Sequence, residues 1–258
     1  MNQQENRGMQ ASAGSKSRIF VTGSASGLGY LTAENLLEAG HSVVVHVRSK
    51  ARASAVQKLV DRGAIVTIGD LADLTQIRDL ARQVNEIGPM DAVIHNAGVM
   101  SGASVLVVNV VAPYLLTALI RRPKRLIYLS SSMHLGGDDN LDGMAWIGKR
   151  VTGSYSDSKL FVTALSFAVA RRWQDVYSNA VDPGWVPTRM GGPSAPDDLR
   201  LGHKTQEWLA VSNDRDALST GGYWHHQQRQ KAHPAASDVT FQNRLLDELA
   251  RATGAVLG

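Results

Sequence analysis

From Arg18 to the C-terminus, short runs rich in valine and isoleucine alternate with longer segments of helical periodicity. Strands that alternate with helices in this way pair in parallel, and the helices cover both faces of the sheet. Strands are expected at 18–22, 43–47, 64–68, 91–95, 125–129, 176–181 and 222–226. The sequence therefore predicts a single doubly wound α/β domain with a parallel sheet of about seven strands.

Apolar residues in the connecting segments recur every three to four positions, which is the spacing of a helix that packs on a sheet. Helices are expected at 28–39, 51–61, 73–87, 104–120, 154–173, 205–211 and 237–252, the last one capped by Ser237 or Asp238. Residues 1–17 are polar and small, and we expect a flexible tail there. Because 184–202 is rich in Gly and Pro, a substrate lid is expected near 185–205 of a domain that spans 18–258.

The chain of 258 residues has no cysteine, which excludes disulfides, thiolate metal ligands and a cysteine nucleophile. No apolar run approaches the roughly 18 residues that span a bilayer, and the N-terminal tail lacks the apolar stretch of a signal peptide. The net charge is +4, from scattered basic residues, which favours a small anionic ligand over nucleic acid. We expect no membrane partner, no nucleic-acid partner and a cytoplasmic location.

The segment TGSASGLG at 22–29 lies between the first expected strand and the first expected helix. Glycines at such a turn let the backbone approach a pyrophosphate, which the N–H groups of the helix N-terminus then face. Gly and Ser could also mark an ordinary surface turn, but the flanking strand and helix favour a phosphate site. The turn therefore predicts a Rossmann-type, dinucleotide-binding domain.

Together with later segments, this turn resembles the pattern of the short-chain dehydrogenase/reductase family, and in particular its retinol dehydrogenase-like and daunorubicin-type ketoreductase-like branches. The matching segments are GDL at 69–71, HNAG at 95–98, Asn109, LSSS at 129–132, YSDSK at 155–159 and DPGWVPT at 182–188. The resemblance implies a nicotinamide cofactor and hydride transfer between that cofactor and a carbonyl compound or alcohol.

The resemblance also implies which residues border the cofactor. The Asp70 position contacts adenine in the family, and Lys159 would bind the nicotinamide ribose. Val186 and Thr188 lie where family members hold the nicotinamide carboxamide. The expected cofactor-binding set is Thr22, Gly23, Ser26, Gly27, Leu28, Gly29, Arg48, Asp70, Leu71, Asn96, Ala97, Gly98, Tyr155, Lys159, Pro183, Gly184, Val186 and Thr188.

Tyr155 and Lys159 are one helical turn apart near the start of an expected helix. A phenol with an ordinary pKa of about 10 matches neutral pH poorly, and a nearby ammonium group lowers that pKa. Tyr155 is therefore expected to be the general acid in reduction and the general base in oxidation. A surface tyrosine above a solvated lysine is the alternative interpretation of this spacing.

The resemblance adds Ser131, which would hydrogen-bond the reacting oxygen, and Asn109, which would hold a water of the proton relay. Ser130 and Ser132 stay open as the catalytic serine, because a slip of one residue would exchange them. Trp185 and His134 are expected in the substrate pocket.

Cofactor choice depends on the end of the second strand, where an acidic side chain would accept hydrogen bonds from the ribose 2′-hydroxyl. Here Val47 is followed by Arg48, Ser49 and Lys50. Arg48 can donate two hydrogen bonds to a 2′-phosphate, and Lys50 adds charge. The sequence therefore predicts a preference for NADP(H), with NAD(H) as the other option.

Two intervals depart from the family pattern. The connection from Gly98 to Asn109 is short, which puts the Asn109 match in doubt, and the connection from Ser131 to Tyr155 is long. No metal site is expected, because the basic and histidine-rich segment lacks matching acidic or thiolate ligands; it contains His225, His226, Arg229, Lys231 and His233.

The leading hypothesis is an NADP(H)-dependent carbonyl reductase or alcohol dehydrogenase with a small-molecule substrate. An NADP(H)-sensing protein without turnover is the main alternative, but it has no reason to retain Ser131, Tyr155 and Lys159 together. A sugar-nucleotide epimerase or dehydratase is third, because few residues follow Asp182. The apolar helices at 104–120 and 154–173 suggest a homodimer or homotetramer.

Overall fold

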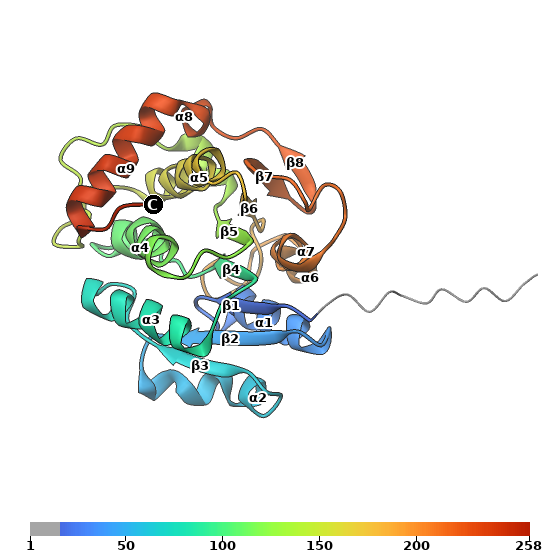
Figure 1. Cartoon of the computed structure of the whole chain (residues 1–258). Helices are drawn as coiled ribbons and strands as arrows, with labels where there is room; N and C mark the ends of the chain where they lie inside the picture. Colours follow the sequence, from blue (N-terminus) through green and yellow to red (C-terminus); the bar gives the residue numbers. More distant parts are fainter. Residues whose placement is uncertain (1–15) are drawn as a thin grey trace, which may run out of the picture.

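The computed structural model describes residues 16–258, and Figure 1 shows them as one sheet flanked by helices. Within these residues eight strands have the order β3-β2-β1-β4-β5-β6-β7-β8. They are β1 (Arg18–Val21), β2 (Ser42–Val47), β3 (Ile65–Ile68), β4 (Ala92–His95), β5 (Arg125–Leu129), β6 (Tyr177–Asp182), β7 (Gly222–His225) and β8 (Gln228–Gln230). The first seven are parallel, as predicted, and the order reverses beside β1.

The eighth strand was not predicted. β8 pairs with β7 in the antiparallel direction across a turn of two residues, His226 and Gln227. Both have positive φ angles, 47° and 61°, which non-glycine residues seldom adopt. Because neither turn residue is Gly, Asn or Asp, and the strand is entirely polar, the sequence carries no hairpin signal here.

Helices cover the sheet on two sides, each with its own hydrophobic core (Figure 1). One core lies under α3 (Leu74–Ile87), α4 (Ala112–Leu119) and α5 (Tyr155–Arg172), with α9 (Val239–Thr253) packed on α5. The other lies under α1 (Gly27–Glu38), α2 (Gln57–Val60) and α7 (Lys204–Val211). Two further α-helices are short, α6 (Leu199–Gly202) and α8 (Pro234–Ser237). This is the predicted doubly wound α/β class.

Two expected helices are irregular. The one at 104–120 contains a π-helical turn over Val107–Val111 directly before α4, and the one at 51–61 is mostly a 3₁₀ helix over Lys50–Val56. π turns widen a helix by one residue and occur often at functional sites. Here the π turn carries Asn109, so the irregular segment coincides with an expected site residue.

The apolar surfaces of α4 and α5 are covered within the chain. The Tyr114 hydroxyl of α4 donates to the Ala255 carbonyl oxygen (2.7 Å), and Phe161 of α5 packs against Phe241 of α9, with ring centres 6.0 Å apart. The apolar character of these helices is therefore explained without a second copy, so it no longer argues for a homo-oligomer. The oligomeric state stays a prediction without that support.

The expected flexible tail at 1–17 lies almost wholly outside the described residues. Ser17 is described, and its N–H donates to His41 Nδ1 (3.2 Å). Across residues 16–258, no helix combines the length and apolarity that crossing a bilayer would need.

Candidate active site

The expected site residues come from distant segments but gather at one edge of the sheet, where the parallel strands end. The glycine turn follows β1, Asn96 follows β4, Ser131 follows β5, and Pro183 follows β6. Tyr155 is the first residue of α5, which packs beside β5 and β6. In an open α/β sheet this edge, at the point where strand order reverses, is the usual ligand crevice.

The turn at 22–29 has the backbone of an anion site. Gly23 and Gly27 have φ angles of +70° and +59°, which favour glycine. Ser26 is the N-cap of α1, but its side chain makes no capping hydrogen bond, and the first turn of α1 has no acidic residue. The helix N-terminus is therefore not neutralised by the chain itself, and it fits the phosphates of a dinucleotide.

Gly29 serves the packing of this turn. A Cβ atom at this position would lie 2.4 Å from Asn96 Nδ2 and 2.5 Å from the Gly23 carbonyl oxygen. Asn96 Nδ2 donates to the Thr22 carbonyl oxygen (2.9 Å), and the buried Thr22 hydroxyl accepts from the Asn96 N–H (2.9 Å). Thr22, Asn96 and Gly29 thus join the ends of β1 and β4.

The expected cofactor-binding residues in the loops after β2 and β3 differ in their contacts and in their exposure to solvent. Asp70 Oδ1 accepts from the Ala72 N–H (2.9 Å), which fixes the loop after β3. The side chain of Leu71 is buried and belongs to the hydrophobic core. Arg48 and Lys50 are exposed directly after β2, and within residues 16–258 no acidic side chain pairs with either.

A capping box positions the first turn of α5. The Ser154 hydroxyl accepts from the Asp157 N–H (3.0 Å), and Asp157 Oδ2 accepts from the Ser154 N–H (2.8 Å). This places Tyr155 at the helix start and Lys159 one turn later, with Lys159 Nζ 5.3 Å from the centre of the Tyr155 ring. The buried Lys159 Nζ donates to the Leu129 carbonyl oxygen at the end of β5 (2.7 Å).

The expected lowering of the Tyr155 pKa is wrong for the protein alone. Burial raises the pKa of Tyr155 to about 12, the charge of Asp182 adds to this, and an interaction with the Ser131 hydroxyl opposes it. Burial lowers the pKa of Lys159 to about 8, while Asp182 raises it. Tyr155 is therefore protonated at neutral pH, because desolvation disfavours the phenolate.

The three serines after β5 have different surroundings. Ser130 is buried and its hydroxyl bonds to Thr163 Oγ1 (2.7 Å), so it is used inside the fold. Ser132 is exposed and belongs to the 3₁₀ helix Ser132–Gly136. Ser131 interacts with Tyr155 and also accepts from the Met133 N–H (3.2 Å). Of the three serines, Ser131 is therefore the one that lies beside Tyr155.

The side-chain amide of Asn109 makes three hydrogen bonds within the protein. Its Oδ1 accepts from the Val99 N–H, and its Nδ2 donates to the Val99 carbonyl oxygen and to the Ser158 hydroxyl, each at 2.9 Å. Both amide hydrogens are therefore used, while Oδ1 keeps a second lone pair that can accept a hydrogen bond, so the relay water at Asn109 stays a prediction. Asn109 also ties the short connection after Gly98 to α5.

His134 does not line a pocket, contrary to expectation. Its side chain has no exposed surface; Nδ1 bonds to the Ser131 carbonyl oxygen (2.8 Å), and Nε2 accepts from the His233 N–H (3.0 Å). His134 therefore connects the backbone of Ser131 to that of His233.

The lid begins with an ordered turn. Gly184 has a φ of +81°, and a Cβ there would lie 2.6 Å from Asp197 Oδ2, the atom that accepts from the Trp185 N–H (2.6 Å). Val186 is buried, whereas the methyl group of Thr188 lies 3.5 Å from the Cβ position of Gly27. Thr188 thus reaches the phosphate turn. Trp185 is 57% exposed, and its indole N–H donates to the Gly191 carbonyl oxygen (2.8 Å).

Asp182 is a site residue that sequence reasoning missed. It is 6% exposed at the end of β6; its Oδ1 accepts from the Gly184 N–H (2.9 Å), and its Oδ2 lies 3.7 Å from His225 Nδ1 on the neighbouring strand. Its charge acts on both Tyr155 and Lys159. The available signal was an acidic residue that ends a mostly buried strand, directly before Pro183.

The histidines and the arginine of the histidine-rich segment at 225–233 contact other residues of the protein. His225 and His226 stack with ring centres 3.8 Å apart, and His233 Nδ1 accepts from the Ala235 N–H (3.2 Å) at the start of α8. Arg229 bonds to the Gly221 carbonyl oxygen (3.1 Å). In the described part of the chain, no three His, Asp or Glu side chains gather into a possible metal site.

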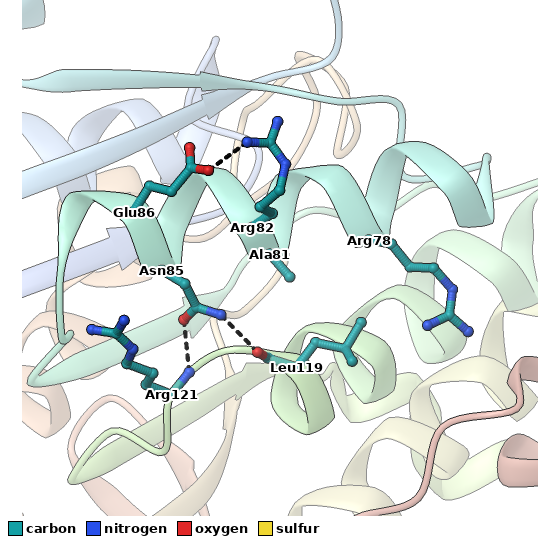
Figure 2. A pocket seen from close by; sticks show the side chains of 7 residues that line it. All are labelled: Arg78, Ala81, Arg82, Asn85, Glu86, Leu119 and Arg121. Atoms are coloured by element: carbon teal, nitrogen blue, oxygen red, sulfur yellow. Dashed lines mark hydrogen bonds and ion pairs between the residues drawn. The ribbon is translucent and has the colours of Figure 1, made fainter.

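A hollow lies away from this edge, between α3 and the end of α4 (Figure 2). Asn85 lines the hollow. Its Nδ2 donates to the Leu119 carbonyl oxygen, and its Oδ1 accepts from the Arg121 N–H, each at 2.8 Å. Arg82 on its rim pairs with Glu86 (2.5 Å) along the same helix. Arg78, also part of the lining, donates to the Thr253 carbonyl oxygen.

Several known proteins are similar to this chain. A family model described as short chain dehydrogenase matches residues 17–119. An uncharacterized oxidoreductase of Emericella nidulans is 38% identical over 244 residues, which are 89% of this chain and 94% of that protein. A short-chain dehydrogenase of Gibberella zeae is 36% identical, over 92% of this chain and 97% of that protein. Human retinol dehydrogenase 13 is 28% identical, over 92% and 84% of the two chains.

Solved structures agree in fold. A protein from Mycobacterium paratuberculosis superposes with a TM-score of 0.79 at 23% identity, covering 94% of this chain and 95% of that one. RhlG of Pseudomonas aeruginosa, solved with NADP, superposes with a TM-score of 0.68 at 21% identity, covering 84% and 97%.

Proposed function

The chain belongs to the short-chain dehydrogenase/reductase family, whose enzymes act on CH–OH or carbonyl groups with NAD(P), and we propose that it is an NADP(H)-dependent carbonyl reductase. The observation that carries the proposal is the position of the half-buried Tyr155 at the start of α5, with Lys159 Nζ 5.3 Å from its ring centre and the Ser131 hydroxyl beside it. When bound, the cofactor supplies the hydride. A protonated phenol is then the group that a newly formed alkoxide needs.

Each residue has a defined task in this proposal. The Ser131 hydroxyl donates a hydrogen bond to the carbonyl oxygen, and Tyr155 gives its hydroxyl proton to the same oxygen as negative charge develops. Lys159 holds positive charge beside the phenol and bonds the nicotinamide ribose. Asn109 keeps α5 in register with the loop after β4, and in this way it positions Tyr155.

The preference for NADP(H) rests on Arg48 and Lys50, which stand exposed after β2 where a carboxylate would select NAD(H). A planar guanidinium group suits a 2′-phosphate. Because cells usually keep the NADP(H) pool reduced, reduction would be the main direction.

Apolar side chains on the surrounding loops support an apolar carbonyl substrate. The loops that leave the ends of β4, β5 and β6 expose Met100, Met133, Leu135, Val151, Trp185 and Met190. Exposed apolar residues around a polar reaction site are typical of ligand grooves.

The test is a panel of aldehydes and ketones with NADPH, followed by the loss of NADPH absorbance. We expect carbonyl-dependent loss that is fastest with apolar compounds, and the reverse reaction with secondary alcohols and NADP⁺. Tight NADPH binding without turnover on any carbonyl compound would favour the sensing protein instead. The homo-oligomer and the cytoplasmic location stay predictions, which light scattering and fractionation can examine.

A further inference from the structure

His46 lies on β2, inside the buried run 43–47, and has no role in the reaction described above. Its side chain is 3% exposed. Nδ1 accepts from the Gly23 N–H at the start of the phosphate-binding turn (3.0 Å), and Nε2 donates to the Gly69 carbonyl oxygen beyond β3 (2.7 Å). One imidazole therefore connects the turn after β1 with the loop that carries Asp70.

The backbone of His46 strengthens the first of these connections. Its carbonyl oxygen accepts from the Ser24 N–H (3.0 Å), and its N–H donates to the Ser24 hydroxyl (3.3 Å). The Ser24 hydroxyl donates onward to the Val21 carbonyl oxygen (2.7 Å). Gly23 and Ser24 are thus held by one residue of the neighbouring strand, at the point where Gly23 takes its positive φ.

The chemistry of the two partners fixes the tautomer. A peptide N–H can only donate and a peptide carbonyl can only accept, so Nδ1 must be bare and Nε2 must carry the hydrogen. A protonated imidazole would place a second N–H against that of Gly23. Burial lowers the pKa of His46, while the Gly69 carbonyl and the charge of Asp70 oppose this, so the neutral form is favoured near neutral pH.

We propose that His46 is a positioning residue for the nucleotide, whose neutral imidazole holds the phosphate-binding turn and the Asp70 loop in the conformation that NADP(H) binds. The proposal rests on the proposed function in one respect, the identity of the nucleotide. It predicts an effect on cofactor affinity and none on the chemical step, because His46 contacts neither Tyr155 nor Lys159.

Three substitutions test the two hydrogen bonds of the His46 side chain separately. His46→Asn keeps an acceptor near the Nδ1 position, His46→Gln keeps a group near Nε2, and His46→Leu removes both. The matched control is His41→Asn, because His41 Nδ1 also accepts a backbone N–H, from Ser17, at the opposite end of β2. Calorimetry with NADP⁺, which tolerates acid, gives the affinity of each variant.

We expect His46→Leu and His46→Gln to weaken NADP⁺ binding about tenfold, because the partly buried N–H of Gly23 loses its partner, with kcat at saturating cofactor within about twofold. His46→Asn should recover most of the affinity. Between about pH 8 and about pH 5, the wild type should lose more affinity than His46→Asn, because only the wild type carries the imidazole that must stay neutral.

Amide hydrogen exchange at positions 23 and 24 tests the same contact without nucleotide. Exchange should accelerate in His46→Leu but not in His41→Asn. A folded His46→Leu protein with wild-type NADP⁺ affinity and wild-type exchange at Gly23 would overturn the proposal. If the wild type does not bind NADP⁺, the proposed function fails, and the exchange result still decides whether His46 orders the turn.

Discussion

The two halves of the ligand-binding edge are built differently. On the nucleotide side, Thr22, Asn96 and His46 bond to the backbone, and the glycines supply the conformations that the turn needs. On the catalytic side, Tyr155, Lys159 and Asp182 affect one another through burial and charge. The backbone conformation of the nucleotide side follows from a motif of neighbouring residues. The pKa values on the catalytic side depend on residues that are far apart in sequence and that only the fold brings together.

The charges of the two halves are also opposite. Exposed Arg48 and Lys50 mark the nucleotide side, and the nearly buried Asp182 marks the catalytic side. Solvent screens the electrostatic interactions of a cation on the surface, whereas a buried carboxylate interacts strongly with neighbouring charges. Substitutions on the catalytic side should therefore change the rate and its pH dependence, and those on the nucleotide side should change affinity and selectivity.

The largest effect is expected for Lys159→Ala, the residue that serves both halves. Removing the ammonium group deprives Tyr155 of its neighbouring charge and the ribose of its donor, so kcat should fall about 10²–10⁴-fold and NADPH affinity should fall as well. Steady-state kinetics and calorimetry check this, with the exposed Lys124→Ala as control. An unchanged NADPH affinity would show that Lys159 belongs to the catalytic side alone.

Gly29→Ala tests the packing of the nucleotide side. The added methyl group would overlap Asn96 Nδ2 and the Gly23 carbonyl oxygen, and overpacking of this kind costs about 1–3 kcal/mol, so NADP⁺ affinity should fall about 10–100-fold. Gly136→Ala is the control, because a Cβ there meets no atom within 4 Å. If both variants bind NADP⁺ equally well, the turn does not depend on close packing.

Arg48→Asp tests cofactor selection. Val47 is buried and 1% exposed, so the position for an introduced carboxylate is the exposed Arg48. The substitution removes the phosphate partner and adds an acceptor for a ribose hydroxyl, and we expect the NADPH-to-NADH ratio of kcat/KM to fall at least about tenfold. Lys58→Asp, with the same change of charge on exposed surface, should leave the ratio unchanged. An unaltered ratio in Arg48→Asp would assign selectivity elsewhere.

The smallest effect is expected for Asp182→Asn, as a change in the pH profile. Asp182 raises the pKa of Tyr155 and that of Lys159, so its removal lowers both. Oxidation requires the deprotonated phenol; its rate rises with pH, and the rise should move to lower pH by up to about one unit. The surface variant Asp175→Asn should not shift it. A shift to higher pH would contradict the assigned role.

The fold and the conformation of the glycine turn were predictable because they depend on periodicity and on glycines at fixed intervals. The seven parallel strands and the 22–29 turn follow from such local patterns. β8 was not predictable, since its polar residues carry no alternation. The burial of His134, the bond from Asn109 to Ser158 and the influence of Asp182 on Tyr155 arise from contacts between segments far apart in sequence.

The central claim is that Tyr155 supplies the proton in carbonyl reduction, and Tyr155→Phe tests it most directly. This change deletes one hydroxyl group and keeps the ring that packs at the start of α5. The single-turnover rate of NADPH oxidation by a reactive carbonyl compound should fall about 10²–10⁴-fold, with NADP⁺ affinity within about threefold of wild type. A Tyr155→Phe protein that reduces the same compound at a near wild-type rate would contradict the account.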